Sequence, residues 1–469
     1  MKIAVIGGGI TGLSAAYYMQ KEILTEQLDA HVELFEANEE LGGKIRTHKE
    51  QGYLIERGPD SFLARKPGVF KLAKEVGMDE EIVPNDAKGA SILSKGRMHS
   101  MPGGAVMGIP TKFAPFAASS LFSPAAKARA AMDLMLPRGG QTADESVGGF
   151  FRRRLGHAVV DQLIEPLLSG IYAGDIDHLS LEATFPQFRR MEEEDRSLIK
   201  GMKKSQAASK EKQEGPSAEQ AMFRSFKYGL SSLVDAIHRH LDEDAVRLGC
   251  TLSEISRESD GLRLTFADGT TDWFDRVLLT VPHHLIPEMI PSFSGNERLS
   301  EAPATTVATV AMGFDQTQLD DITLEGTGFL VADKANYDIT ACTFTHRKWS
   351  HTAPEGKGLL RTYVGRPGQE DIVSESDETI VERAVNDLKR IMPLKGEPEF
   401  SVVTRWRNSM PQYLVGHKDK VQAIETHLEE EFPGLYVTGA SFGGIGLPDC
   451  VTQGEKAAYN LLSLVQGQS

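Results

Sequence analysis

The spacing of hydrophobic residues changes early in the chain. A run rich in β-branched residues occupies positions 3–6, and after a cluster of glycines Leu13, Ala16 and Tyr17 recur at the spacing of one helical face. A second apolar run, at residues 31–36, follows. This order predicts a strand, a tight turn, a helix and a second strand, which is the beginning of an α/β fold with a parallel sheet.

Later segments show the helical pattern and the strand pattern again. Residues 229–241 have the pattern of an amphipathic helix, and a second helix is predicted near 377–391. Strands are predicted at 251–257, 262–267, 276–281, 307–314, 328–331, 339–345 and 359–364. The last four predict a second, mixed sheet that roofs a substrate pocket. The polar stretch 203–216 is predicted to be a solvated loop.

The glycine cluster has a recognisable pattern, Gly7-x-Gly9-x-x-Gly12, between the first predicted strand and helix. In this context Gly7 allows a tight turn, Gly9 lets backbone amides approach a pyrophosphate, and Gly12 lets the helix pack on the strand. The second strand ends in Glu36, near the distance of roughly 20 residues expected for a carboxylate that binds ribose hydroxyls. The sequence therefore predicts a dinucleotide at the N-terminus of the first helix.

Two further glycine segments indicate that the dinucleotide is FAD. Gly42-Gly43 follows soon after Glu36, where a simple NAD enzyme has no need for a second glycine pair. Near the C-terminus, a strand at 434–438 runs into a glycine-rich turn and then into a helix through 451–461. The N-terminus of this helix is expected to face a flavin ring. Non-covalent binding is expected, because no cysteine or histidine lies in a flavin motif.

The chain is predicted to form three parts, two of them discontinuous. These are an FAD-binding domain (1–60, 222–287 and 400–469), a substrate-binding domain (61–90, 180–221 and 288–399) and a helical domain (91–179). Apolar stretches within 98–136 are interrupted by Lys112, Pro115 and Pro124, and a spanning helix needs ~20 apolar residues. They form either an apolar wall of the pocket or a surface that contacts a membrane or a partner.

Composition excludes some functions. The chain has 469 residues, a net charge of −15 and no basic stripe, which argues against nucleic-acid binding. Its three cysteines, Cys250, Cys342 and Cys450, are far apart, so neither a structural metal site nor a disulfide framework is expected. The glycine pattern occupies the N-terminus, which leaves no room for a cleavable signal peptide. We therefore expect a cytoplasmic enzyme with, at most, a peripheral contact at the inner face of the membrane.

Several motifs resemble one enzyme family over almost the whole chain. Besides the N-terminal pattern, they are 56–61 (Glu-Arg-Gly-Pro-Asp-Ser), 168–175 (Leu-Ser-Gly-Ile-Tyr-Ala-Gly-Asp), 410–413 (Met-Pro-Gln-Tyr) and 438–448. They resemble the HemY-type porphyrinogen oxidases of haem biosynthesis, and most closely the Gram-positive branch that oxidises coproporphyrinogen III. The glycine motifs are shared with amine oxidases and carotenoid desaturases, whereas the motifs at 168–175 and 410–413 are more particular.

The resemblance implies an α/β chain (α+β overall) with a Rossmann-like FAD-binding domain of the amine oxidase and porphyrinogen oxidase type. It implies a six-electron oxidation of coproporphyrinogen III in which hydride passes to the flavin, oxygen reoxidises the flavin and hydrogen peroxide forms. Protoporphyrinogen IX is a second expected substrate, and a transient ferrochelatase contact is expected. The cofactor-binding residues that it implies are Gly7, Gly8, Gly9, Ile10, Thr11, Gly12, Glu36, Ala37, Gly43, Lys44, Arg46, Gly58, Pro59, Asp60, Ser61, Val246, Trp406, Gly439, Ile445, Gly446 and Leu447.

A substrate with four propionates needs cations in an otherwise acidic protein. Arg65 and Lys66 are the first candidates, because they closely follow the 56–61 motif, and Lys88 and Arg97 come next. Eukaryotic relatives carry an arginine in the strand where this chain has Ser91. That departure leaves the identity of the anchoring residues open.

Other candidates lie near the tetrapyrrole or belong to rival functions. Tyr363, Ile171 and Phe329 are expected to contact the ring, and Tyr363 is also expected to exchange a proton. His283 and His284 close a buried strand and are expected to be turn residues rather than metal ligands. The alternative functions are a flavin amine oxidase or carotenoid-type desaturase on the same scaffold, or a non-catalytic flavoprotein that docks on a membrane or a haem-pathway partner.

Overall fold

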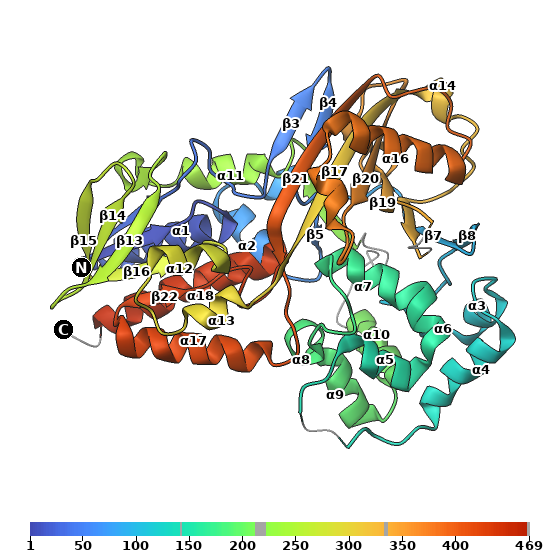
Figure 1. Cartoon of the computed structure of the whole chain (residues 1–469), viewed down its shortest axis with the longest axis horizontal. Helices are drawn as coiled ribbons and strands as arrows, with labels where there is room; N and C mark the ends of the chain where they lie inside the picture. The colour runs from blue at the N-terminus through green and yellow to red at the C-terminus, as the bar shows by residue number, and fades with distance from the viewer. Residues whose placement is uncertain (141–142, 212–221, 333–335, 467–469) are drawn as a thin grey trace.

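The computed structural model describes residues 1–140, 143–211, 222–332 and 336–466. A sheet with flanking helices lies at the end of the molecule that holds both termini (Figure 1). A larger sheet lies toward the other end, with a layer of helices beneath it.

The sheet near the termini has five parallel strands in the order β12-β2-β1-β16-β22. They are β1 (Lys2–Ile6), β2 (His31–Phe35), β12 (Val246–Arg247), β16 (Arg276–Leu279) and β22 (Leu435–Val437). Along β1, Ile3 and Val5 belong to one hydrophobic core, whereas Ala4 and Ile6 belong to the core on the opposite face. Both faces are therefore covered, which explains why the strand is apolar from Ile3 to Ile6.

Helices from both ends of the chain cover one face of this sheet. They are α1 (Ile10–Glu26), α2 (Gly68–Glu75), α11 (Ser231–His238) and α18 (Leu447–Gln466). Helices α1 and α18 pack closely, because a Cβ atom on Gly454 would lie only 2.4 Å from the carbonyl oxygen of Thr11. The other face carries the antiparallel strands β13 (Leu252–Arg257), β14 (Leu262–Phe266) and β15 (Thr271–Phe274) with helices α12 (Ile286–Met289), α13 (Asn296–Ser300) and α17 (His417–Glu431).

The larger sheet has seven strands in the order β21-β17-β20-β19-β18-β7-β8. They are β21 (Phe400–Pro411), β17 (Ala304–Asp315), β20 (Lys357–Val364), β19 (Ile339–Phe344), β18 (Gly328–Val331), β7 (Ser91–Ser94) and β8 (Arg97–Ser100). The sheet is mixed, because β18 and β7 are parallel whereas the other neighbours are antiparallel. Helix α16 (Asp377–Ile391) covers one face through Ile380, Ala384 and Leu388.

Shorter elements lie between and beside these layers. They are the hairpin β3 (Thr47–Glu50) and β4 (Tyr53–Glu56), the small sheet of β5 (Phe62–Leu63), β11 (Phe223–Phe226) and β6 (Ile82–Pro84), the pair β9 (Ala105–Val106) and β10 (Ile109–Pro110), and helices α14 (Gln316–Leu319) and α15 (Thr345–Lys348).

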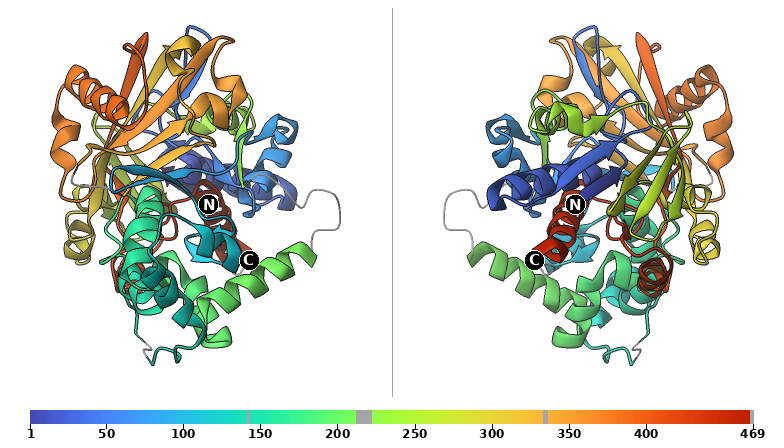
Figure 2. Two further views of the ribbon diagram at one scale, coloured as in Figure 1. Left: turned by 90° about the vertical axis from the view of Figure 1, so that its right-hand side faces the viewer. Right: turned by 90° about the vertical axis from the view of Figure 1, so that its left-hand side faces the viewer.

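The helical layer has its own hydrophobic core, which includes the fully buried Phe150, Phe151 and Phe188. Its helices are α3 (Phe113–Ala118), α4 (Pro124–Ala131), α5 (Val147–Leu155), α6 (His157–Val159), α7 (Glu165–Tyr172), α8 (Leu181–Thr184), α9 (Pro186–Asp195) and α10 (Leu198–Glu211). A π-helical turn at Val160–Ile164 leads directly into α7. Figure 2 shows α10 extending along the lower edge of this layer.

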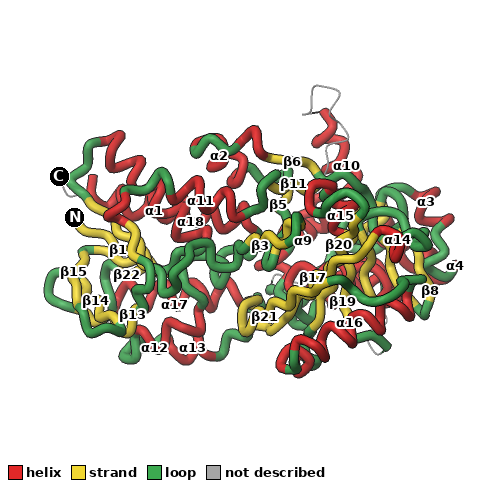
Figure 3. The backbone as a smooth tube through the Cα atoms, turned by 90° about the horizontal axis from the view of Figure 1, so that it is seen from above, coloured by secondary structure: helices red, strands yellow, loops and turns green. Residues whose placement is uncertain are grey.

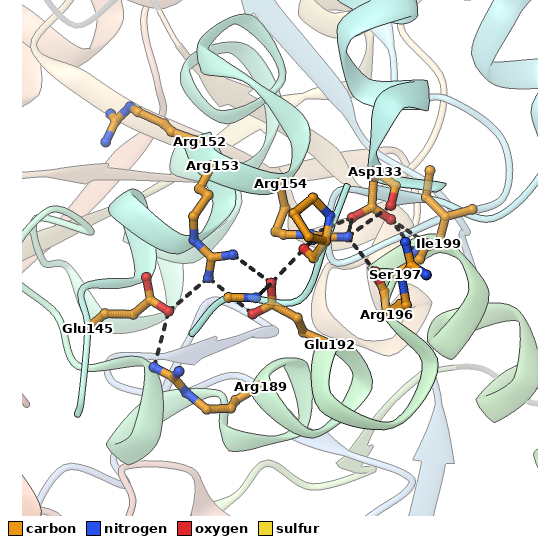
Figure 4. A network of polar contacts seen from close by, with 12 residues as sticks. Asp133, Glu145, Arg152, Arg153, Arg154, Arg189, Glu192, Arg196, Ser197 and Ile199 are labelled. Carbon is orange, nitrogen blue, oxygen red and sulfur yellow. Dashed lines mark hydrogen bonds and ion pairs between the residues drawn. The ribbon is translucent and has the colours of Figure 1, made fainter. Parts of the chain in front are cut away.

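A buried ion network joins three segments of the helical layer (Figure 4). The guanidinium of Arg154 on α5 is 1% exposed and lies 2.6 Å from Asp133 and 3.2 Å from Glu192 on α9. Arg153 and Arg189 extend the network through Glu145, at 3.0 and 3.1 Å. The charges are paired and hydrogen-bonded, as buried charges must be.

The structure revises the predicted boundaries between the parts. Residues 91–100 form β7 and β8 of the larger sheet and not part of the helical domain. Strand β21, predicted within the FAD-binding segment 400–469, belongs to the larger sheet as well. Helices α8 to α10, predicted within the substrate-binding segment 180–221, pack into the core of the helical layer instead.

The loop predicted at 203–216 is wrong for residues 203–211, which belong to α10, and residues 212–216 lie outside the described residues. Leu198, Ile199 and Met202 anchor this helix in the core, and the lysines and alanines that follow are good helix formers.

The apolar segment 98–136 divides between interior and surface. Phe116 and Phe122 are buried in the helical core, whereas Phe113 is 76% and Met135 is 80% exposed. Within the described ranges, every helix is too short or too polar to cross a membrane.

Candidate active site

A cavity of about 1670 Å³ lies where the two sheets and the helical layer meet. Its wall comes from the carboxyl ends of β1, β2 and β16, from α7, and from β17 to β21. Figure 3 shows the strands of the parallel sheet toward one end of the molecule and those of the larger sheet toward the other. The carboxyl edge of an open parallel sheet is where such folds bind ligands.

The Gly7–Gly12 segment forms the turn that its sequence predicts. Gly7 has a φ of +109° and donates its N–H to the carbonyl of Phe35 at 2.8 Å. A Cβ on Gly12 would lie 2.0 Å from the carbonyl oxygen of Gly7, whereas a Cβ on Gly9 would meet no atom within 4 Å. Gly9 lines the cavity, and α1 begins there without a side-chain cap. Its free N–H groups therefore suit an anionic phosphate.

Glu36 lines the cavity directly after β2. It is 7% exposed and accepts hydrogen bonds from the backbone N–H groups of Gly8 at 2.7 Å and Asn38 at 2.9 Å. These contacts hold the carboxylate beside the glycine turn, where a ribose would follow a pyrophosphate.

The second glycine pair packs on the first. The N–H of Gly42 donates to the carbonyl of Gly8 at 2.8 Å, and Gly43 lines the cavity beside Gly9. Lys44 follows, and its amine donates to the carbonyl of Ser409, while burial lowers its pKa. Arg46 Nε donates to the carbonyl of Gly43 at 3.2 Å. Both cations line the cavity.

Residues 58–61 form a strip of the cavity wall held by buried charges. Lys348 lies 2.7 Å from Asp60, and the Ser61 hydroxyl donates to Asp60 at 2.6 Å. Burial alone would raise the pKa of Asp60, but the Lys348 and Arg361 cations outweigh it and hold this pKa well below its usual range. Trp406 on β21 lines the cavity and donates its indole N–H to the carbonyl of Arg57 at 3.0 Å.

The two motifs at 168–175 and 410–413 contact each other beside the cavity. Gln412 donates its amide to the carbonyl of Tyr172 at 2.8 Å. A Cβ on Gly174 would lie 2.0 Å from Gln412 Oε1, so a larger residue there would displace the Gln412 side chain. The hydroxyl of Tyr413 donates to the carbonyl of Ala440 at 2.5 Å and accepts from the N–H of Gly444 at 2.8 Å. The motifs thus brace α7 against the C-terminal glycine turn.

Comparison with known proteins identifies the fold. The family model "Flavin containing amine oxidoreductase" matches residues 10–462. The chain belongs to the flavin-containing amine oxidoreductase family. Among its relatives, the coproporphyrinogen III oxidase of Bacillus subtilis (strain 168) is 46% identical over 98% of both chains. The coproporphyrinogen III oxidase of Staphylococcus aureus (strain NCTC 8325 / PS 47) is 42% identical over 98% of this chain and 99% of its own.

Solved structures agree with this membership. A structure from Exiguobacterium sp. 255-15, named a protoporphyrinogen oxidase, superposes with a TM-score of 0.88 at 39% identity and covers 98% of this chain and 99% of its own. A UDP-galactopyranose mutase, at 17% identity and a TM-score of 0.73, shares the fold.

The cavity fits the flavin dinucleotide of the family. Open space above Gly9, the uncapped start of α1 and the carboxylate of Glu36 in the cavity wall suit its pyrophosphate and ribose. The predicted cofactor-binding residues that line the cavity are Gly7, Gly9, Ile10, Thr11, Glu36, Ala37, Gly43, Lys44, Arg46, Gly58, Pro59, Asp60, Ser61, Trp406, Ile445, Gly446 and Leu447. Four of the predicted residues do not line the cavity: Gly8, Gly12, Val246 and Gly439. Val246 belongs to the edge strand β12, and a few residues later in the chain Cys250 to Ser253 do line the cavity.

The four cations predicted to anchor substrate do not line the cavity. Arg65 is exposed, and Lys66 is bound to both oxygens of Asp449 at 2.6 Å. Lys88 and Arg97 are exposed, and Arg97 lies on β8 at the outer edge of the larger sheet. The prediction relied on proximity in sequence to the 56–61 motif, but the chain turns away from the cavity after Ser61.

Of the residues predicted to contact the ring, Ile171 and Tyr363 line the cavity and Phe329 does not. Phe329 is 2% exposed in the core beneath the larger sheet, because successive side chains of a strand point to opposite faces; its neighbour Leu330 lines the cavity instead. The hydroxyl of Tyr363 lies 3.3 Å from that of Thr343.

The two histidines are turn residues, as predicted, in the short turn His283–Leu285. His283 lines the cavity and its Nδ1 lies 2.9 Å from the Ser441 hydroxyl. Across the described ranges, no group of three or more histidine, cysteine, aspartate or glutamate side chains is arranged to hold a metal.

Sequence reasoning missed Lys348, Arg361, Arg366 and Glu165, all of which line the cavity. Glu165 adjoins the 168–175 motif and follows a π-helical turn, a feature often found at functional sites. Arg361 and Arg366 lie on either side of Tyr363 in the sequence. Arg361 is two residues from Tyr363 on β20, so the two side chains point to the same face of the sheet, and this alternation was a signal for Arg361. Lys348 gave no local signal.

Proposed function

We propose that this chain is an FAD-dependent, oxygen-using porphyrinogen oxidase that converts coproporphyrinogen III to coproporphyrin III in haem biosynthesis. The observation that carries the proposal is near-full-length similarity to two coproporphyrinogen III oxidases, at 46% and 42% identity. Protoporphyrinogen IX would be a poorer substrate, and hydrogen peroxide the second product.

The size of the cavity supports this function. Its volume of about 1670 Å³ exceeds the roughly 300–1,000 Å³ usual for a single small-molecule ligand, so a dinucleotide and a tetrapyrrole can share it. Bound FAD would supply the two-electron acceptor. The Gly7–Gly12 turn, with Glu36, Ala37, Lys44 and Arg46, would hold the nucleotide. Residues 58–61, Trp406 and 445–447 would enclose its ring, with Gly8, Val246 and Gly439 as supports.

Tyr363 is the proposed proton-handling residue. It lies on the cavity wall, and its hydroxyl lies 3.3 Å from that of Thr343. A hydroxyl in this position would take part in removing a pyrrole proton during each two-electron step.

An amine substrate fits the wall less well. The guanidinium of Arg361 lies 5.1 Å from the centre of the Tyr363 ring. A cation therefore already occupies one aromatic face that an amine-binding cage would use. A carotenoid-type desaturase has no need of the cations that line this cavity.

Turnover distinguishes the candidate functions. The purified protein should develop porphyrin fluorescence from coproporphyrinogen III under air, with oxygen uptake and hydrogen peroxide formation. Catalytic efficiency should favour coproporphyrinogen III over protoporphyrinogen IX by about tenfold or more, because each lost charge-assisted contact costs roughly 1.5–3 kcal/mol. Oxidation of an amine or a carotenoid in place of both porphyrinogens would contradict the proposal.

We place the enzyme in the cytoplasm, with at most peripheral membrane contact and a transient ferrochelatase contact. The exposed Phe113, Met132, Leu134 and Met135 are the surface that supports such a contact. Co-sedimentation with anionic vesicles, compared between the wild type and Phe113→Ser/Met135→Ser, tests the membrane contact.

A further inference from the structure

Five lysine and arginine side chains line the cavity within the described residues: Lys44, Arg46, Lys348, Arg361 and Arg366. Two of them, Lys348 and Arg361, contact residues 58–61, which would enclose the flavin ring and which we call the flavin strip. The ammonium of Lys348 lies 2.7 Å from Asp60. The guanidinium of Arg361 donates to the carbonyl of Gly58. The flavin strip is therefore held by two cations.

These charged groups are largely shielded from water. The side chains of Lys348 and Asp60 are 12% and 14% exposed, and Arg361 is 4% exposed. Aromatic faces cover both cations, because the Lys348 ammonium lies 5.0 Å from the centre of the Phe223 ring and the Arg361 guanidinium 5.1 Å from that of Tyr363. Charges in such surroundings act more strongly on their neighbours than exposed charges, because little water or salt screens them.

The cluster of Lys348, Arg361 and Asp60 holds more positive than negative charge. Among the described residues, Asp60 is the one carboxylate within 4 Å of either cation. Burial alone would raise the pKa of Asp60, but the two cations hold this pKa well below its usual range, so the carboxylate is ionised at neutral pH. Two positive charges are thus balanced by one negative charge.

A second acid, Glu56, lines a small cavity together with Asp60 and Arg361. Its carboxyl oxygens accept hydrogen bonds from the N–H of Leu230 at 2.6 Å and from the hydroxyl of Thr47 at 3.0 Å. Burial raises the pKa of Glu56 to about 7, so at pH 7 it is ionised in only about half of the molecules. Glu56 therefore leaves an excess of positive charge in the cluster.

The flavin strip lets this charge act close to the proposed position of the ring. Lys348, Arg361 and Asp60 belong to the cavity lining themselves. Between them Gly58 presents no side chain, and a Cβ atom there would lie 1.9 Å from the carbonyl oxygen of Lys44. Charge near a flavin ring changes how readily the ring accepts electrons, so the excess charge of the cluster bears on the chemistry of the cofactor.

We propose that the cluster of Lys348, Arg361 and Asp60 raises the midpoint potential of the bound flavin, because its excess positive charge stabilises the ring that has accepted a hydride. The hydride leaves a carbon of the porphyrinogen with both electrons of the C–H bond, and the neutral ring then carries one negative charge. Oxygen and one proton take up the hydride as hydrogen peroxide, which returns the ring to its neutral form. The inference rests on the proposed function, but its test needs only bound FAD.

The midpoint potential of bound FAD tests the proposal. The holoenzyme is reduced at pH 7 together with a reference dye, and the absorbance of the flavin and of the dye gives the potential. The variants are Lys348→Met, Asp60→Asn, the double variant of the two, Lys348→Arg and Arg361→Gln. Lys357→Met and Glu399→Gln are the matched controls, because this ion pair, at 2.6 Å, lies outside the cavity lining. Thermal unfolding establishes that each variant is folded.

Lys348→Met and Arg361→Gln should lower the potential, and Asp60→Asn should raise it. Each shift should be about 30 mV or more, which is a tenfold change in the equilibrium of a two-electron couple. The double variant should return toward the wild-type value, because it removes one charge of each sign. Lys348→Arg keeps the charge and should keep the potential. The two controls should change the same equilibrium by less than about twofold.

Shifts in the same direction for Lys348→Met and Asp60→Asn would overturn the proposal, because a loosened flavin strip would change both potentials alike. Shifts no larger than those of the controls would overturn it as well. Should Lys348→Met or Arg361→Gln lose the flavin, Asp60→Asn and Lys348→Arg decide the matter. Expected shifts in a protein that does not oxidise coproporphyrinogen III would refute the proposed function alone. Normal turnover of coproporphyrinogen III with one potential in all variants would refute this inference alone.

Discussion

Glu36 illustrates how one residue prepares the proposed nucleotide site. Both of its carboxylate oxygens are held by backbone N–H groups, those of Gly8 and Asn38, before any ligand arrives. Glu36 lines the cavity, and a carboxylate has further acceptor capacity beyond these bonds. The charge and the position of Glu36 should both matter for FAD affinity.

Glu36→Gln keeps the shape of the side chain and removes its charge. Charge-assisted hydrogen bonds contribute roughly 1.5–3 kcal/mol each, so FAD affinity should fall by about tenfold or more while the fold survives. Flavin release measured by fluorescence checks this. Glu40→Gln, at an exposed position close by, is the control and should leave the affinity unchanged. Unaltered affinity in Glu36→Gln would remove Glu36 from the site.

Glu56 makes stability depend on pH. Burial raises the pKa of this carboxyl from 4.5 to about 7, although the Leu230 N–H and the Thr47 hydroxyl act in the opposite direction. Below pH 4.5 the carboxyl is protonated in both folded and unfolded chains. Between pH 4.5 and 7 only the unfolded chain ionises, so the stabilising contribution is lost as pH rises, by about 3 kcal/mol in total.

Relative to Glu56→Gln, the wild type should therefore lose stability between pH 4.5 and 7 and change little above pH 7. Urea unfolding of both proteins at pH 5 and pH 8 measures the difference. Glu254→Gln, on the exposed side of β13, provides the comparison and should show no such trend. A constant difference between wild type and Glu56→Gln would mean that Glu56 is ionised at both pH values.

Residues with local signals were predictable from sequence. Gly7, Gly9 and Glu36 occupy the cavity positions that their spacing predicts, because a strand, a turn and a helix fix them within one segment. Lys348 and Arg366 carry no such signal. Each reaches the cavity only because the larger sheet brings distant segments together, and pairing between strands distant in sequence cannot be read from a local pattern.

At the scale of elements, Arg154 connects α5 with α9 and with the turn at Asp133. Arg154→Met removes the cation and leaves the carboxylate of Asp133, which is fully buried, without a counter-charge. Breaking a buried pair in this way should destabilise the protein by about 3–5 kcal/mol. Thermal and urea unfolding measure the loss.

Arg190→Met on the exposed side of α9 is the control and should change stability by less than about 0.5 kcal/mol. Adding Asp133→Asn to Arg154→Met should recover part of the loss, because asparagine accepts the same hydrogen bonds from Ser197 and Ile199 without a charge. No recovery would show that packing of the Arg154 stem, rather than its charge, stabilises this region.

Elements were predicted well where hydrophobic spacing decides them. Helix α16 and strand β18 match the predictions at 377–391 and 328–331. The predicted loop at 203–211 is wrong because three buried residues at the start of α10 extend the helix through a polar sequence. Domain boundaries are wrong at β7, β8 and β21 for a similar reason. The alternation of hydrophobic residues indicates that a segment is a strand, but it does not indicate which sheet the strand joins.

At the scale of the whole molecule, the two chain ends meet at one site. Helix α1 begins at the Gly7–Gly12 turn, α18 begins at the C-terminal glycine turn, and both starts line the cavity. The sequence alone predicted this closure, because each end carries its own strand, glycine turn and helix. A ligand that contacts the N-termini of both α1 and α18 therefore links the two ends of the chain.

FAD should therefore stabilise the entire chain and not only its N-terminal part. A ligand present at 100 times its Kd and bound only to the folded state adds about 2.7 kcal/mol, so removal of the flavin should lower Tm in a single transition and added FAD should restore it. NAD should have no effect. The flavin should be released by denaturation, because burial raises the pKa of both thiols that line the cavity, that of Cys450 to about 11, and so disfavours the nucleophilic thiolate. Flavin that stays on the denatured chain would show a covalent link, and a Tm that responds to NAD instead of FAD would contradict the assignment of the cofactor.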